Sequence, residues 1–194
     1  MAPEERRAAL IEATVPLLHE HGVEVSTRQI AQAAGVAEGT IFGVFPDKNS
    51  LLVAALLRAL DPQPTLSALA AVDRGKDLRE RLKKAAELVN DRFTENAHLM
   101  TAARKMIIAA GTHPEAAALM IGSREKMTAA LAEVIEPDAA NLRRPPEYVA
   151  RMLLLFCGAN TYGPFGDPDH FDGAEMVSLL LDGLLRTTGV PERC

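Results

Sequence analysis

Residues 26–52, STRQIAQAAGVAEGTIFGVFPDKNSLL, predict two short helices joined by a tight turn, followed by the start of a third helix. Ser26 is a suitable N-cap, and Gln29 stands three positions later, as a capping box requires. Gly35 stands where a helix ends in the left-handed conformation, which glycine adopts without strain. A second helix is predicted over residues 38–44. Two helices joined in this way form a helix-turn-helix, whose second helix can enter the major groove of DNA.

This block resembles the N-terminal domain of TetR-type (AcrR-type) transcriptional regulators, over about the first fifty-five residues. The resemblance implies an all-α fold, with an N-terminal three-helix DNA-binding domain and a larger C-terminal helical domain that binds a ligand and dimerises. It also implies a DNA-binding transcriptional regulator, a ligand-responsive repressor that acts as a homodimer on a palindromic operator. The residues that carry the resemblance are Thr27, Ile30-Ala31, Ala34-Gly35-Val36, Gly39-Thr40, Phe45, Lys48 and Leu51-Leu52.

The places of individual residues within this motif predict the DNA contacts. We expect Thr40 to contact bases, and Lys48 to contact phosphates together with backbone N–H groups at a helix N-terminus. Arg28 is either a phosphate or groove contact or a solvated surface arginine. Thr27 either donates its hydroxyl to a phosphate or supports the helix cap. The full set predicted for DNA binding is Thr27, Arg28, Glu38, Gly39, Thr40, Phe42, Gly43 and Lys48.

The chain departs from the resembled pattern around the second helix of the motif. Ala37 stands where Ser often caps that helix, and Phe42 stands where Tyr usually offers a hydroxyl to a phosphate. Gly43 and Val44 occupy places that polar or basic side chains usually fill. The first fifty-five residues also contain more acidic than basic residues. A helical small-molecule-binding or interaction module that has lost specific DNA binding therefore stays open as an alternative.

Composition places the chain among globular proteins and gives no sign of a membrane protein. Its 194 residues are 48% hydrophobic and 24% charged, with a net charge of −5. Its apolar runs are too short to span a bilayer, and its N-terminus lacks the apolar segment of a signal peptide. Cys157 and Cys194 do not make a disulfide framework, and Cys157 lies in an apolar run typical of a buried thiol. We therefore expect a cytoplasmic protein.

Further helices are predicted on both sides of the motif. The helix over residues 4–21 contains Pro16, for which we expect a kink near Glu12 rather than an end. The helix over 77–96 has one apolar stripe and a charged side that we expect to be solvated. The prolines after Asp61 place the domain boundary close by, giving a DNA-binding domain over 1–58 and a ligand-binding and dimerisation domain over 59–194. The other predicted helices cover residues 48–60, capped by Asp47, and 97–110, 114–135, 147–162 and 172–188.

Methionines and aromatic residues of the larger domain are candidates for a ligand cavity between helices. Methionine adapts to irregular apolar pockets, but it is also ordinary core filler, so both readings stay open. A cavity of this composition predicts a small apolar or amphipathic effector. The candidate lining residues are Phe93, Met100, Met106, Met120, Met127, Met152, Phe156 and Tyr162.

Two apolar stripes near the C-terminus are candidates for a dimer interface. In the resembled family two such helices pair with their copies in a four-helix interface, whereas the stripes alone are equally consistent with an intramolecular core. A two-fold dimer suits DNA reading, because one short recognition helix makes few contacts alone. The residues predicted for the interface are Val149, Leu153, Leu179, Leu180, Gly183 and Leu184.

The sequence contains no motif that predicts catalysis, a metal or a cofactor. His98, His113 and His170 lack the spacing of metal ligands, and Cys157 has no basic neighbour in sequence to activate it. No phosphate-cradling glycine loop or spaced catalytic constellation stands out. We therefore expect a binding protein rather than an enzyme, without a cofactor or a bound metal.

Overall fold

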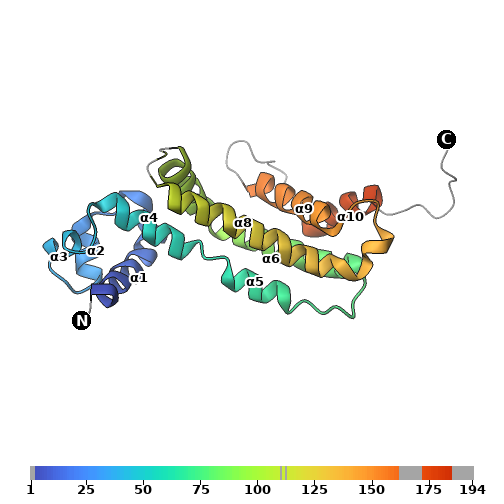
Figure 1. The fold of residues 1–194 in the computed structure, drawn as a ribbon, viewed down its shortest axis with the longest axis horizontal. Coiled ribbons are helices and arrows are strands. Elements are labelled where there is room, and N and C mark those ends of the chain that lie inside the picture. The colour runs from blue at the N-terminus through green and yellow to red at the C-terminus, as the bar shows by residue number, and fades with distance from the viewer. Residues whose placement is uncertain (1–2, 110, 112, 162–171, 185–194) are drawn as a thin grey trace. The chain divides into compact units, whose positions relative to one another are not determined.

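The computed structural model describes residues 3–109, 111, 113–161 and 172–184, and these residues form helices and no β-strand (Figure 1). The all-α fold class predicted from the sequence is confirmed. The chain forms two compact units, one made of Met1–Asp61 and Asn96–Ser123 and the other of Pro62–Glu95 and Arg124–Cys194. We call them unit 1 and unit 2. The domain division at residue 58 stays a prediction, since the compact units are assembled from alternating parts of the chain.

Unit 1 contains the helix-turn-helix and the segment that begins at Asn96. Its first helix runs through Pro16 to His21, as expected from the continuing apolar pattern. The predicted helix over 97–110 is instead an α-helix that continues as a six-residue π-helix. The elements of unit 1 are α1 (Pro3–His21), the short 3-10 helix η1 (Gly22–Glu24), α2 (Thr27–Ala33), α3 (Gly39–Phe42), α4 (Lys48–Ala59), α7 (Ala97–Ala103), the π-helix η2 (Arg104–Ala109) and the first part of α8 (Pro114–Ile135).

One apolar cluster holds unit 1 together. Leucine and isoleucine side chains of α1, α2, α3 and α4 pack with Leu99 of α7 and Ile107 of η2. Phe45 closes the helix-turn-helix and is buried, with the Arg7 guanidinium 4.3 Å from the centre of its ring. Arg58 of α4 donates to a carboxylate oxygen of Glu12 on α1 at 2.5 Å. These contacts hold the helix-turn-helix against α1, α4 and α7.

Unit 2 is built around α6, against which both α9 and α10 pack (Figure 1). At Gly173 an added Cβ would lie 3.3 Å from the Ala86 Cβ, so the absence of a side chain permits close approach of α10 to α6. Cys157 of α9 is buried in this core, which confirms the predicted buried thiol, and burial raises its pKa to about 12. The elements of unit 2 are α5 (Gln63–Ala70), α6 (Leu78–Glu95), the remainder of α8, the 3-10 helix η3 (Glu136–Asn141), α9 (Pro146–Thr161) and α10 (Gly173–Leu184).

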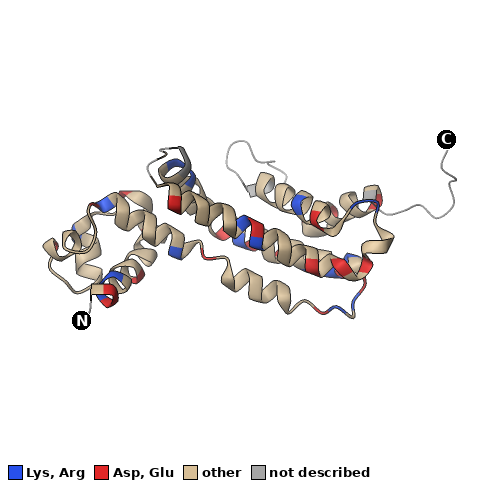
Figure 2. Cartoon of the chain, in the orientation of Figure 1, with Lys and Arg blue, Asp and Glu red and all other residues tan. Residues whose placement is uncertain are grey.

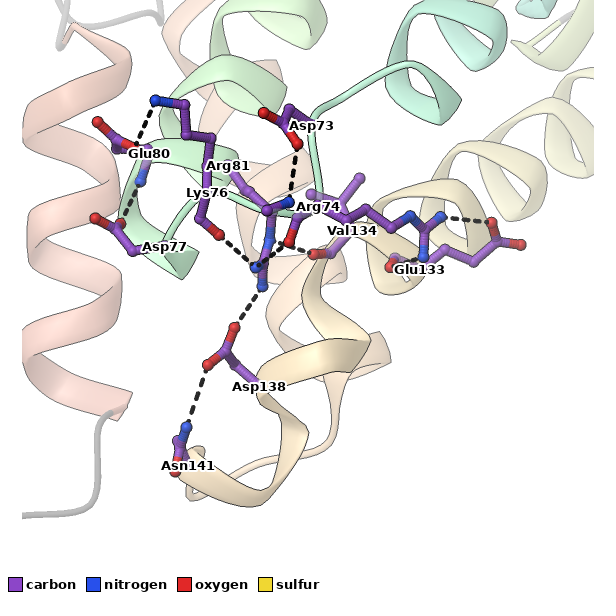
Figure 3. A network of polar contacts seen from close by, with 11 residues as sticks. Asp73, Arg74, Lys76, Asp77, Glu80, Arg81, Glu133, Val134, Asp138 and Asn141 are labelled. Carbon is purple, nitrogen blue, oxygen red and sulfur yellow. Dashed lines mark hydrogen bonds and ion pairs between the residues drawn. The ribbon is translucent and has the colours of Figure 1, made fainter.

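Arg81 of α6 corrects the expectation that the charged side of this helix is solvated (Figure 3). Its side chain is 3% exposed and forms an ion pair with Asp138 of η3 at 2.5 Å. The guanidinium also donates to the carbonyls of Val134 at 3.1 Å and Lys76 at 2.8 Å. Arg81 follows Leu78 by three positions and precedes Ala85 by four, so helical periodicity places it at the edge of the apolar stripe of α6. The end of α8 and the loop before α6 cover it there.

Candidate nucleic-acid interface

The turn of the helix-turn-helix is built from the local signals that the sequence contains. Gln29 donates its backbone N–H to the Ser26 hydroxyl at 3.2 Å, and Ser26 donates its own N–H to the Gln29 side chain at 2.9 Å. This reciprocal pair confirms the predicted capping box. Gly35 has a φ of 65°, the left-handed conformation predicted for it, and the next residue donates its N–H to the Ala31 carbonyl at 3.0 Å.

The second helix of the motif, α3, is a single turn from Gly39 to Phe42, shorter than the predicted range of 38–44. Ile41 points into the core of unit 1, whereas Phe42 is 54% exposed. No side chain caps the start of α3, as the alanine at position 37 implies. The helix itself contains no charged residue (Figure 2), so its outward surface offers the Phe42 ring and the partly exposed Thr40.

Thr27 and Glu38 contact each other directly. The Thr27 hydroxyl donates to a carboxylate oxygen of Glu38, the residue that immediately precedes α3. Glu38 is exposed, and Thr27 is exposed to a lesser degree at the first turn of α2. In this structure the hydroxyl of Thr27 therefore neither caps α2 nor stands free for a phosphate, and it orients an acidic side chain beside α3.

Lys48 and Arg28 are the basic residues that the sequence predicts for phosphate contact. The Lys48 ammonium donates to the Val23 carbonyl at 3.4 Å, which holds it beside the first turn of α4. In that turn Asp47 accepts the Ser50 backbone N–H at 2.7 Å, which confirms the predicted N-cap. This bond holds the pKa of Asp47 below its usual range, so the carboxylate is charged at neutral pH. Arg28 lies on the first turn of α2.

Known proteins resemble this chain most clearly over the same segment. The family model of bacterial regulatory proteins, tetR family, matches residues 10–55. The transcriptional repressor KstR of Rhodococcus jostii is 43% identical over 61 residues, which cover 31% of this chain and 29% of that protein. The transcriptional regulator BetI of Yersinia pestis is 44% identical over 86 residues, which cover 42% of each chain. The matched part is thus less than half the length of either relative.

The similarity of fold extends over nearly the whole chain. A TetR-family transcriptional regulator structure from Mesorhizobium loti superposes with a TM-score of 0.70 at 18% identity, over 96% of this chain and 100% of that one. Residues 10–55 of the chain are thus similar to the tetR family of bacterial regulatory proteins. The superposition shows that the fold as a whole is similar to that of the Mesorhizobium loti structure.

The candidate pocket residues divide between the two units. Met100, Met106 and Met120 are partly buried against the core of unit 1. Phe93, Met127 and Met152 lie in or against the core of unit 2, and Phe156 is 47% exposed. Tyr162 lies outside the described residues. The predicted pocket stays a prediction, because its candidates are divided between two units and of these residues only Met152 and Phe156 line the hollow described below.

The candidate dimer residues also divide, between core and surface. Val149, Leu153 and Leu180 are buried in the core of unit 2. For these three residues the structure agrees with the intramolecular core that the sequence left open as an alternative to a dimer interface. Leu179 is 62% exposed and Gly183 is exposed, while the side chain of Leu184 lies outside the described ones. The exposed members flank a shallow hollow on α9 and α10, lined by Tyr148, Met152, Phe156, Leu179, Leu180 and Gly183.

Sequence reasoning missed two features of these regions. The Arg7 guanidinium over Phe45 and the Thr27–Glu38 hydrogen bond join residues far apart in the sequence, which no local pattern predicts.

Within the helices that the structure describes, none is long and apolar enough to cross a membrane.

Proposed function

We propose that this chain is a DNA-binding transcriptional regulator, a ligand-responsive repressor that acts as a homodimer on a palindromic operator. The observation that carries the proposal is the complete helix-turn-helix, with its capping box, left-handed glycine and exposed second helix, inside the segment that matches the tetR family model. The relatives KstR and BetI are named a transcriptional repressor and a transcriptional regulator. Such a protein acts in the cytoplasm, and it needs neither a cofactor nor catalysis.

The proposed DNA contacts depend on position more than on charge. Thr40 and Phe42 lie on α3, where they can contact bases. Lys48 and the first backbone N–H groups of α4 can contact a phosphate. Arg28 adds a positive charge on the first turn of α2. Since few basic side chains take part, we expect a modest salt dependence of the affinity.

The proposed dimer uses the exposed apolar face of α9 and α10. Leu155, Phe156 and Leu179 are each about half exposed or more, and large apolar side chains gathered on one face favour association with a partner. The hollow that Phe156 and Leu179 help to line has a volume of about 240 Å³, smaller than a typical small-molecule pocket, so it suits side chains of a second copy better than an effector.

The proposed effector is a small apolar or amphipathic molecule. Support comes from the partly buried methionines Met100, Met106 and Met120, which lie on elements packed beside the helix-turn-helix within unit 1. A ligand changes DNA affinity only by binding one conformation more tightly than another. Binding to the native state also raises the melting temperature by mass action, so a thermal-shift panel of apolar and charged compounds tests the chemical class.

The second candidate function is a helical binding module without specific DNA binding. It is favoured by the absence of any charged residue in α3 and by the carboxylates of Glu38 and Asp47 on either side of it. Phosphates are repelled by both carboxylates at neutral pH. This candidate predicts a dimer that binds effectors but retains no DNA.

A mobility-shift assay with fragments of the source genome separates the two candidates. The regulator predicts that full-length dimer retains a small set of fragments at physiological salt, in preference to a large excess of scrambled duplex. Retention of no fragment, by a protein whose melting temperature rises with an effector, supports the binding module and contradicts the proposed regulator.

A further inference from the structure

The acidic residue beside α3 is held in a defined orientation by a neutral partner. The Thr27 hydroxyl donates to one carboxylate oxygen of Glu38, and no ion pair involving Glu38 occurs among the described residues. The Glu38 side chain is exposed beside the helix that the proposed function places in the major groove. A negatively charged acceptor at this place is unsuited to a phosphate, and its chemistry favours a hydrogen-bond donor as partner.

The chemistry of a carboxylate restricts what it can accept from DNA. An ionised carboxylate has only acceptor atoms, so it gains nothing from phosphates or from guanine, whose N7 and O6 also accept. The donors in the major groove are the N4 amino group of cytosine and the N6 amino group of adenine. Adenine pairs its donor with the N7 acceptor, which repels a carboxylate, whereas cytosine presents the donor alone.

We infer that Glu38 is a specificity-determining residue that accepts a hydrogen bond from a cytosine N4 amino group, and that Thr27 is the positioning residue that holds its carboxylate. The inference rests on the proposed DNA-binding function and adds the base that one side chain reads. The bond from Thr27 fixes the carboxylate before DNA arrives, so less side-chain freedom is lost on binding. The same charge repels phosphates at every other sequence, so Glu38 lowers nonspecific affinity.

Selection of bound duplexes from a random pool tests this reading. We expect full-length wild-type protein to enrich duplexes with cytosine at one position of each half-site, preferred by roughly tenfold over the other bases. A glutamine side chain offers a donor as well as an acceptor, which suits adenine N6 and N7. The Glu38→Gln variant is therefore expected to replace that cytosine by adenine and to bind scrambled duplex more tightly.

Variants at Thr27 separate positioning from a merely structural role. Thr27→Val keeps the shape of the side chain but removes the donor, so the cytosine preference falls by roughly threefold without a change of base. Thr27→Ser keeps a hydroxyl and is expected to restore the preference. Glu24→Gln is the matched control, since it removes an exposed carboxylate of unit 1 outside the helix-turn-helix and leaves every base preference as in wild type.

The outcomes distinguish this inference from the proposed function. If wild type and Glu38→Gln enrich the same base at every position, Glu38 reads no base, while DNA binding itself stands. If wild type binds duplexes without enriching any sequence, the inference is again overturned and only nonspecific binding remains. If no duplex is retained by protein whose circular dichroism shows a folded helical chain, both the proposed function and the inference are wrong.

Discussion

The helix-turn-helix and the Arg81 network differ in the sequence distance over which their contacts form. The capping box joins Ser26 to a residue three positions away. Arg81 instead bonds to the Val134 carbonyl, 53 positions away, and to Asp138, 57 positions away. Local signals therefore build the proposed DNA-contacting segment, while the core of unit 2 depends on chain segments that meet only after folding.

The two regions differ in how strongly a substitution is expected to destabilise them. A local cap or turn contributes about 1 kcal/mol, so its loss weakens one element. A buried charge with distant partners is more sensitive, because removing one partner leaves the other uncompensated in the core. The following substitutions test this contrast.

The largest expected effect is on stability, and it should differ between two neighbouring leucines of α10. Leu180→Glu places a charge in the core of unit 2, so we expect the free energy of unfolding to fall by about 4 kcal/mol or more. Leu179→Glu changes a side chain that is 62% exposed, and it should leave the fold intact but give monomers at micromolar concentration. Chemical denaturation and light scattering measure the two effects. A wild-type monomer at that concentration contradicts the proposed dimer.

The next effect concerns the buried ion pair. Asp138→Ala leaves the Arg81 guanidinium buried without its carboxylate, and we expect the free energy of unfolding to fall by about 3 kcal/mol. Arg74→Ala removes an exposed pair with Glu133 in the same region and should cost less than about 1 kcal/mol. Urea titration followed by circular dichroism measures both. If the free energy of unfolding falls equally in the two variants, burial does not make the Arg81–Asp138 pair more sensitive than an exposed pair.

A smaller effect is expected at the turn of the helix-turn-helix. Gly35→Ala forces an alanine into a φ of +65°, at a cost of roughly 1 kcal/mol, although an added Cβ meets no atom there. Gly39→Ala is the matched control, since its Cβ also has open space and its φ is not left-handed. The difference between the melting temperatures of the two variants measures the cost of the left-handed backbone conformation for alanine. A loss in Gly39→Ala as large as in Gly35→Ala contradicts this explanation.

The smallest expected change improves DNA binding. At Gly43 an added Cβ meets only the Thr40 carbonyl oxygen at 3.5 Å, an ordinary contact, so a side chain can begin at this exposed position without a clash. Gly43→Arg adds a charge at the end of α3 and should tighten binding to all duplexes by severalfold, with a steeper salt dependence. Gly43→Gln controls for size without charge. Weaker binding by the arginine variant would place Gly43 away from the phosphates.

Much of the fold and part of the site follow from sequence, for a physical reason. The caps at Ser26 and Asp47 and the glycine at position 35 are correctly predicted because their partners lie within one helical turn. The partners of Arg81 are not predictable in this way, since the Val134 carbonyl and Asp138 lie 53 and 57 positions away in the sequence. The apolar stripe of α10 is likewise predicted, yet only the structure separates buried Leu180 from exposed Leu179.

The central claim, that DNA binds through the helix-turn-helix, is tested most directly by the salt dependence of Lys48→Ala. Fluorescence anisotropy with a selected and a scrambled duplex, across a salt series, gives the affinity and the number of ions released. We expect Lys48→Ala to weaken binding to both duplexes about equally and to reduce the salt slope by roughly one ion per subunit. Lys84→Ala, which removes an exposed lysine of α6, controls for net charge and should leave the slope unchanged. An unchanged affinity and slope in Lys48→Ala would contradict the proposed docking of this helix-turn-helix on DNA.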